Sequence, residues 1–353
     1  MSWPANIKEV KKLQLEISNY CNARCPACAR EKSITKDDKQ HIGINDTYVS
    51  LDTFKKWFDN GDFFWSLRLI DFCGNYDEPT TNPHLLDIIE WIFESGIFSR
   101  QLQVNIATNG GTRNKDFWRK LGKLAAKYQY LKAPRRGTTN PGTIQRLNVI
   151  FGIDGLEDTN HLYRRNVNWN KLQENFRTYI AAGGRASWQF IYFKHNEHQD
   201  ELARQRSIDE GFERIKFRGT KSRIHKIVTP GTGKHELDTK KTTKKIVCKA
   251  LQRPDYFGLD SGLYITVKGA VLPCCWWGTE AHITDLENTY NKKYNFKDIH
   301  LGNGKNFQEI LDSPWYSNLH ATIQTEIFDK CVHHCKQNII STINNQIHEE
   351  TMR

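Results

Sequence analysis

One stretch near the start of the chain decides the fold: Leu13-Gln-Leu-Glu-Ile-Ser18, followed by Asn-Tyr-Cys21-Asn-Ala-Arg-Cys25-Pro-Ala-Cys28. Apolar and polar residues alternate over its first part, which predicts a β-strand. The cysteines that follow have the spacing C-x3-C-x2-C. Three cysteines cannot all pair as disulfides within one loop, whereas three thiolates can hold an iron–sulfur cluster and leave one iron without a protein ligand. We therefore expect a strand that ends in a cluster-binding loop with an open iron.

Length and composition predict the domain size and the cellular location of the protein. The 353 residues suffice for a sizeable core and for one large domain with a smaller one. No apolar run is long enough to span a membrane, and the start, Met1-Ser-Trp-Pro-Ala-Asn6, lacks the apolar core of a signal peptide. We expect a cytoplasmic protein without membrane contact, in which reducing conditions favour metal ligation over disulfides for the nine cysteines.

The net charge of +11 favours an anionic partner, although a basic surface also serves solubility. Basic residues are concentrated beyond residue 218, around the turn-forming stretch Thr229-Pro-Gly-Thr-Gly233. This composition predicts a basic linker over residues 221–247. Contact of that segment with a polyanion such as nucleic acid is the less favoured alternative.

Strand-like and helix-like segments alternate through the first two thirds of the chain, as a βα-repeat architecture requires. Such a fold places its functional loops at the carboxyl ends of its strands, where the cysteine loop is expected. The predicted strands are residues 12–18, 66–72, 103–108, 146–153, 186–193 and 214–217, and the predicted helices are residues 51–58, 84–94, 114–128, 170–182 and 200–210.

The cysteine spacing at the end of a first strand resembles that of the radical S-adenosylmethionine (radical SAM) superfamily. The resemblance implies an α/β fold, a partial (β/α)6 TIM-type barrel over residues 1–220. It also implies a 4Fe-4S cluster on Cys21, Cys25 and Cys28, whose open iron binds the amino and carboxylate groups of S-adenosylmethionine. One electron, from a donor of the flavodoxin or ferredoxin type, would cleave the cofactor to a 5'-deoxyadenosyl radical that abstracts hydrogen from a substrate.

The turn after the second predicted strand carries the next part of the resemblance. The sequence Gly74-Asn75-Tyr-Asp77-Glu78-Pro79 resembles the Gly-Gly-Glu-Pro motif that meets the methionine amino group in that family. Asp77 and Glu78 stand where the family has one acid, and we favour Glu78 because it precedes the proline. An ordinary acidic turn is the alternative.

Two further turns resemble cofactor-lining turns of the family. They are Thr108-Asn109-Gly and Gly152-Ile-Asp154-Gly, and Gly152 occupies a position that is serine in the family. Arg164, after the fourth predicted strand, could clamp the methionine carboxylate, with a surface charge as the alternative. The isolated Cys73 is expected to be a small buried hydrophobic residue.

Residues 248–353 resemble the SPASM or twitch extensions of radical SAM enzymes, which implies a small C-terminal α+β iron–sulfur domain. A β-hairpin over residues 263–272 would bring Cys274 beside other ligands. We expect one auxiliary 4Fe-4S cluster on Cys248, Cys274, Cys331 and Cys335. Cys275 could replace Cys274, and a structural zinc is the alternative to iron and sulfide.

The sequence thus predicts a radical SAM enzyme that acts on a peptide or protein, or on a small molecule, and a separate peptide-recognition partner is expected. That partner is suggested because only about ten residues precede the first strand. Ten tryptophans and the basic segment leave a nucleotide, sugar or nucleic-acid substrate as the alternative within enzymes. A non-catalytic zinc protein that binds nucleic acid is less favoured. Trp57, Trp91 and Trp118 lie on predicted amphipathic helices, where packing accounts for them.

Overall fold

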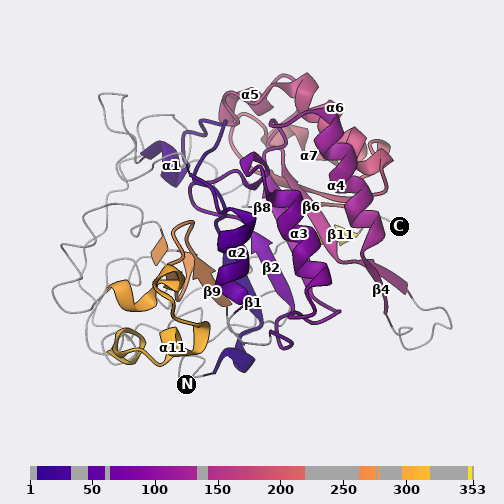
Figure 1. Ribbon diagram of the computed structural model, residues 1–353. Helices are drawn as coiled ribbons and strands as arrows, with labels where there is room; N and C mark the ends of the chain where they lie inside the picture. Colours follow the sequence, from indigo (N-terminus) through magenta and orange to yellow (C-terminus); the bar gives the residue numbers. More distant parts are fainter. Residues whose placement is uncertain are drawn as a thin grey trace, which may run out of the picture.

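The computed structural model describes residues 6–32, 47–59, 64–132, 142–218, 262–275, 277–278, 296–318 and 349–351. Its centre is one nine-stranded sheet in the order β10-β9-β1-β2-β3-β6-β7-β8-β11 (Figure 1). Six of these strands run parallel and follow their order in the sequence. They are β1 (Lys12–Leu15), β2 (Leu69–Phe72), β3 (Gln103–Thr108), β6 (Leu147–Gly152), β7 (Arg185–Ile191) and β8 (Arg214–Arg218).

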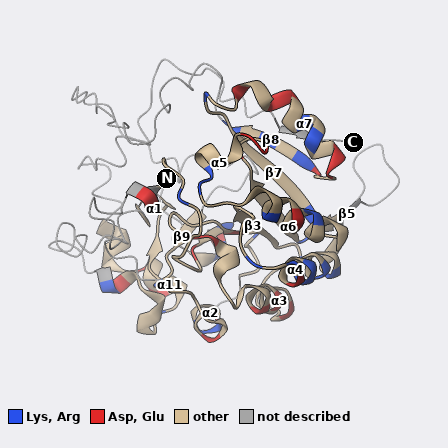
Figure 2. Ribbon diagram, turned by 90° about the horizontal axis from the view of Figure 1, so that it is seen from above, with Lys and Arg blue, Asp and Glu red and all other residues tan. Residues whose placement is uncertain are grey.

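All six predicted strands and all five predicted helices are present, which confirms the βα-repeat. The helices lie in an arc around the strands, as the view from above shows (Figure 2). They are α2 (Leu51–Phe58), α3 (Leu85–Glu94), α4 (Lys115–Lys127), α6 (Trp169–Ala181) and α7 (Asp200–Asp209), with short helices α1 (Ala29–Lys32) and α5 (Asn160–Tyr163) in the loops.

β1 and β2 fall furthest short of the lengths that their sequence patterns predict. β1 ends at Leu15 rather than residue 18. The first residues of the predicted second strand instead form a turn, in which the Leu67 amide donates to the Phe64 carbonyl over 3.1 Å. An antiparallel hairpin of β4 (Gln129–Lys132) and β5 (Gly142–Gln145) is an addition that the sequence analysis did not predict.

The predicted C-terminal hairpin is present and extends the barrel sheet itself. β9 (Gly262–Ile265) pairs with β10 (Val271–Leu272) in antiparallel fashion and with β1 in parallel, with Leu13 opposite Leu263. At the far edge, β11 (Glu349–Thr351) pairs antiparallel with β8. The barrel is therefore open, with added strands on both of its edges.

The two faces of the sheet differ in chemistry. Side chains on the outer face are apolar and pack under the helices, and Leu13, Val104 and Val149 are fully buried. On the inner face a chain of polar contacts crosses all six strands. It joins Lys12 to Asp71 (2.8 Å), Asp71 to Asn105 (2.8 Å), Asn105 to Asn148 (3.3 Å), Asn148 to Ser187 (3.0 Å) and Ser187 to Arg214 (3.2 Å).

Candidate active site

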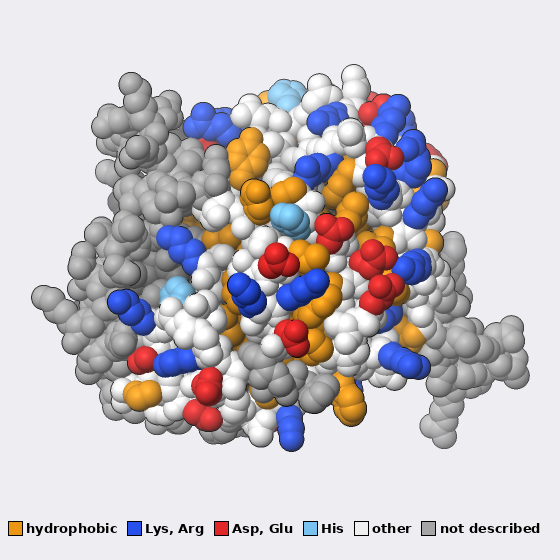
Figure 3. All heavy atoms as spheres, in the orientation of Figure 1, with side chains coloured by type: hydrophobic (Ala, Val, Ile, Leu, Met, Phe, Trp, Pro, Cys, Tyr) orange, Lys and Arg blue, Asp and Glu red, His pale blue; other side chains and the backbone are white. Residues whose placement is uncertain are grey.

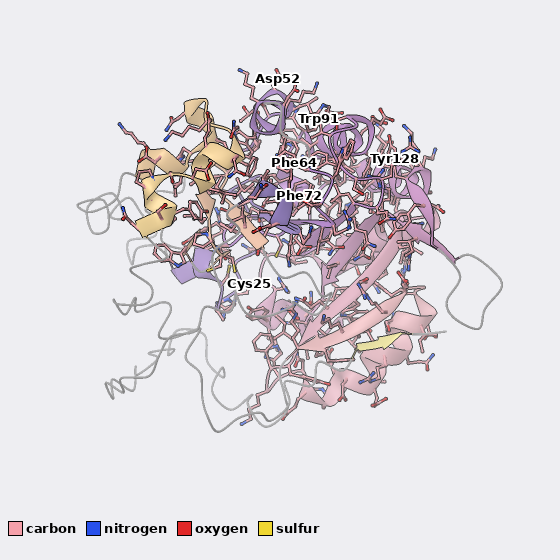
Figure 4. The ribbon with its side chains drawn as sticks, turned by 90° about the horizontal axis from the view of Figure 1, so that it is seen from below. Cys25, Asp52, Phe64, Phe72, Trp91 and Tyr128 are labelled. Carbon is pink, nitrogen blue, oxygen red and sulfur yellow. The ribbon has the colours of Figure 1, made fainter. Side chains whose placement is uncertain are left out.

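The three cysteines of the first loop lie beyond the carboxyl end of β1, and none of them is in a disulfide. The loop is held by its backbone, since the Arg24 amide donates to the Arg165 carbonyl over 3.0 Å. It is also held through Asn22, whose side-chain oxygen accepts from Asn109 Nδ2 over 2.8 Å. Figure 4 shows Cys25 and neighbouring sulfur atoms on the side of the sheet opposite Asp52 and Trp91, which lie on the outer helices.

In these surroundings the thiols of Cys21 and Cys25 stay protonated unless a positively charged centre is bound. Burial raises the pKa of Cys25 to about 11, although the Arg164 guanidinium opposes the shift. Burial also raises the pKa of Cys21, and the Glu78 carboxylate adds to the effect. Buried thiolates need a compensating positive charge, which a metal centre supplies. Three unpaired thiols whose charges act on one another are thus a donor set that fits an iron–sulfur cluster.

A single metal ion does not fit the same residues. Within the described ranges, no three side chains of His, Cys, Asp or Glu form a group that could hold one ion. In a four-iron cluster each thiolate binds a different iron, so the ligands need not converge on one point. Cluster binding is therefore the chemistry that the donor set supports.

Glu78 lies between the ends of β2 and β3, and its carboxylate is held by the neighbouring turn. Its Oε1 accepts from the hydroxyls of Thr80 and Thr108, each over 2.6 Å, and its Oε2 accepts from the Asn109 amide over 2.6 Å. Burial raises the pKa of Glu78, whereas these hydrogen bonds lower it. Three predicted site residues thus meet at one carboxylate, because Thr108 and Asn109 both donate to Glu78.

Asp77 points elsewhere. Its Oδ1 accepts from the Gly74 amide over 2.7 Å, which closes the turn. A Cβ built on Gly74 would lie 2.4 Å from Asp77 Oδ1 and 2.5 Å from the Glu16 side chain. Gly74 is therefore explained by packing against two carboxyl groups of the protein, whereas the sequence suggested an approach to a ligand. Of the two acids, Glu78 is the one placed at the end of β3.

Asp154 and Arg164 form a buried ion pair after β6. Arg164 Nε donates to Asp154 Oδ2 over 2.7 Å, and the Ile191 amide donates to Asp154 Oδ1 over 2.6 Å. Both carboxylate oxygens are thus used within the protein. The guanidinium continues to the cysteine loop, where its Nη1 lies 3.9 Å from Cys25 Sγ. Arg164 is therefore not an exposed surface charge, since its side chain is 18% exposed.

Asn75 connects the cofactor-motif turn to the C-terminal hairpin. Its Nδ2 donates to the Tyr264 hydroxyl over 3.2 Å and to the Cys275 carbonyl over 2.7 Å. Tyr264 and Glu16 are two site residues that the sequence analysis missed, and both are fully buried. The acidic Glu16 within an alternating strand, just before the cysteine loop, was the available signal.

The structure separates the two adjacent cysteines of the hairpin. Cys73, expected to be buried, is only half-buried, and the Cys275 thiol acts on it electrostatically, while Cys274 acts on the buried Tyr316. Cys275 is partly buried and packs against the hydrophobic core of the molecule. The remaining expected ligands of an auxiliary cluster, Cys248, Cys331 and Cys335, lie outside the described residues, as does the predicted linker over 221–247.

Comparison with known proteins gives one curated relative and several solved structures. No protein-family model matches the chain. The tungsten-containing aldehyde ferredoxin oxidoreductase cofactor-modifying protein of Pyrococcus furiosus is 29% identical over 121 residues, which are 34% of this chain and 30% of that protein. The match therefore spans less than a third of the relative's length.

The similar solved structures cover most of the chain. SuiB of Streptococcus suis, bound to S-adenosylmethionine, has a TM-score of 0.50 and 14% identity, over 88% of this chain and 68% of SuiB. The enzyme anSMEcpe with bound AdoMet has a TM-score of 0.51 and 13% identity, over 92% of this chain and 86% of its own. This chain has their fold, a partial TIM-type α/β barrel.

Proposed function

We propose that this protein is a radical SAM enzyme that abstracts hydrogen from a peptide or protein substrate. The observation that carries the proposal is the position of the three unpaired cysteines at the carboxyl end of the parallel sheet, beside Glu78 and Asn109. Chemistry in such folds takes place at this edge. The fold shared with two proteins solved with bound S-adenosylmethionine supports the same conclusion.

The chain's own residues have separate roles in this proposal. Cys21, Cys25 and Cys28 would hold a 4Fe-4S cluster, which when bound supplies the electron that cleaves S-adenosylmethionine to a 5'-deoxyadenosyl radical. Glu78 would accept hydrogen bonds from the methionine ammonium, since its Oε2 already accepts from one protein donor and retains a further lone pair. Thr108 and Asn109 keep this carboxylate in place.

A peptidyl substrate is favoured by one of the similar structures. SuiB has also been solved with its precursor peptide SuiA, and that structure matches this chain with a TM-score of 0.51 and 14% identity. An electron donor of the flavodoxin or ferredoxin type completes the proposal. A separate peptide-recognition partner also belongs to the proposal. A small-molecule substrate is the alternative, because the curated relative is named for modifying a cofactor.

The described surface gives less support to nucleic acid as substrate. The predicted packing of Trp57 and Trp118 is confirmed, since both are buried, and Trp91 is half-buried. Lys127 of α4 is paired with acids, at 2.9 Å from Glu90 and from Glu94. Figure 3 accordingly shows basic and acidic side chains interspersed on the viewed face. No helix among the described residues is long and apolar enough to cross a membrane.

We also propose one auxiliary 4Fe-4S cluster in the C-terminal segment. Cys274 is favoured as the ligand from the hairpin, because Cys275 packs against the hydrophobic core. Iron fits thiolate ligands at least as well as zinc does, and a closed four-thiolate site is typical of either.

Anaerobic purification with iron and sulfide tests the proposal. We expect about eight irons per chain, from two four-iron clusters, and formation of 5'-deoxyadenosine when reductant and S-adenosylmethionine are added. The variant Cys25→Ala should lose about four irons and all cleavage, because an open cluster needs all three thiolates. Iron analysis and chromatography of the products provide the measurements.

The matched control is Cys73→Ser, which changes a half-buried cysteine outside the loop. It should keep the iron content of the unmodified chain. Zinc in place of iron, or a fully loaded protein that leaves S-adenosylmethionine intact, would contradict the proposed function.

A further inference from the structure

Arg164 is held in place by contacts of its backbone and of its guanidinium. Its backbone ends α5, where its amide donates to the Asn160 carbonyl over 2.8 Å. The Asn160 side chain in turn accepts from the Asp154 amide over 2.9 Å. Asp154 is fully buried and binds Arg164 Nε over 2.7 Å. Asp154 after β6, Asn160 in α5 and Arg164 are thus joined by hydrogen bonds.

The three nitrogens of this guanidinium have three different neighbours. Nε binds Asp154, and Nη1 lies 3.9 Å from Cys25 Sγ. Nη2 lies over Gly152, where an added Cβ would come within 2.5 Å of it. Gly152 is the position that is serine in the family, so its lack of a side chain gives the guanidinium the space to reach the cysteine loop.

The three cysteines consequently have unequal surroundings. Cys25 faces a guanidinium cation, Cys21 faces the Asn109 amide nitrogen at 3.7 Å, and Cys28 faces the Asn75 carbonyl oxygen at 3.9 Å. A cation stabilises a thiolate most, an amide donor less, and a carbonyl oxygen not at all. Cys25 therefore has the most strongly stabilised thiolate of the three, because the Arg164 guanidinium of the buried ion pair lies beside it.

We propose that Arg164 is a positioning residue that donates to the Cys25 sulfur and raises the reduction potential of the cluster in this loop. Asp154 holds its guanidinium, and the absence of a side chain at Gly152 leaves room for it. The inference deepens the proposed function and rests on it. Reduction adds one negative charge to the cluster, and a fixed cation beside a ligand sulfur stabilises the reduced form more than the oxidised form. The contact between Arg164 and Cys25 therefore favours reduction of the cluster.

A redox titration followed by electron paramagnetic resonance, without S-adenosylmethionine, tests the inference on the full chain. Cys25→Ala identifies the signal of this loop by its loss. Arg164→Gln should make reduction about tenfold less favourable, which is a shift of about 59 mV to more negative potential for one electron. Gly152→Ala should shift the potential in the same direction while the arginine is kept, because the new Cβ displaces the guanidinium.

Two further variants separate charge from general disturbance. Arg164→Lys should shift the potential less than Arg164→Gln does, since an ammonium keeps the charge and loses the fixed geometry. Arg165→Gln removes the neighbouring exposed charge and should leave the potential unchanged.

The possible failures are distinguishable. Weaker binding of S-adenosylmethionine by Arg164→Gln at an unchanged potential would show a clamp and overturn the inference alone. Equal shifts in Arg165→Gln would also overturn it. An unmodified chain without a cluster signal from this loop would overturn the proposed function and the inference together.

Discussion

At the scale of single residues, the site depends on buried charges that the protein itself brings together. Asp77 is buried near Glu16, and one of its oxygens lies buried without a hydrogen-bond partner. Burial raises the pKa of Asp77 well above its ordinary value, and the Glu16 charge adds to this. The folded protein therefore holds this proton more tightly than the unfolded chain does.

The pH dependence of stability follows from that difference. A carboxyl whose pKa is higher in the folded state contributes most below its unfolded value, near 3.8, and its contribution falls as pH rises toward the folded pKa. We expect Asp77→Asn to raise the free energy of unfolding at pH 8 by about 1.5 kcal/mol, because a neutral amide keeps the Gly74 contact and can donate to Glu16. At pH 4 the gain should be much smaller.

Urea unfolding at pH 8 and at pH 4 measures the change in the free energy of unfolding. Asp52→Asn, at an exposed position of α2, removes the same charge and should change stability by less than about 1 kcal/mol at either pH. A gain in Asp77→Asn that is equal at both pH values would contradict the raised pKa.

At the scale of the elements, polar contacts join the strands across the inner face of the sheet. Asn105 of β3 lies at the middle of this chain, donating to Asp71 of β2 and accepting from Asn148 of β6. TIM barrels normally fill this face with branched apolar side chains. Here each hydrogen-bonded polar group depends on a partner from a neighbouring strand.

Asn105→Leu should lower the free energy of unfolding by about 1–3 kcal/mol, because it leaves partners on two neighbouring strands unsatisfied. Thermal or urea unfolding measures the loss. Gln103→Leu is the matched control on the same strand and face, since the Gln103 side chain contacts Tyr130 of the β4 hairpin at 3.2 Å. The inner-face contacts would be unimportant if both variants lost the same small amount.

At the scale of the whole molecule, the C-terminal segment is packed onto the barrel. β9 pairs with β1, and Phe307 of α11 (Phe307–Leu311) contacts Phe58 and Phe64 with ring centroids 5.4 and 5.2 Å apart. The Ile7 amide also donates to the Gln308 side chain over 3.0 Å. The described parts of both regions therefore share one core.

Phe307→Ala should destabilise the barrel together with the hairpin, by about 3–5 kcal/mol, because it leaves a cavity between them. Hydrogen exchange should show faster opening in β1 as well as in β9. Trp65→Ala, at a 63% exposed side chain, is the control and should cost about 0.5 kcal/mol or less. Faster exchange confined to β9 and α11 would show that the two regions fold separately.

The sequence by itself determined the βα-repeat and the cysteine loop, because both are local: strand and helix periods lie within single segments, and Cys21, Cys25 and Cys28 are near one another in the chain. Only the tertiary structure decided how distant groups meet. It placed Arg164 on Cys25, turned Glu78 toward Asn109 and Asp77 toward Glu16, and set β9 against β1. These contacts depend on packing between residues far apart in the chain, which no local pattern encodes.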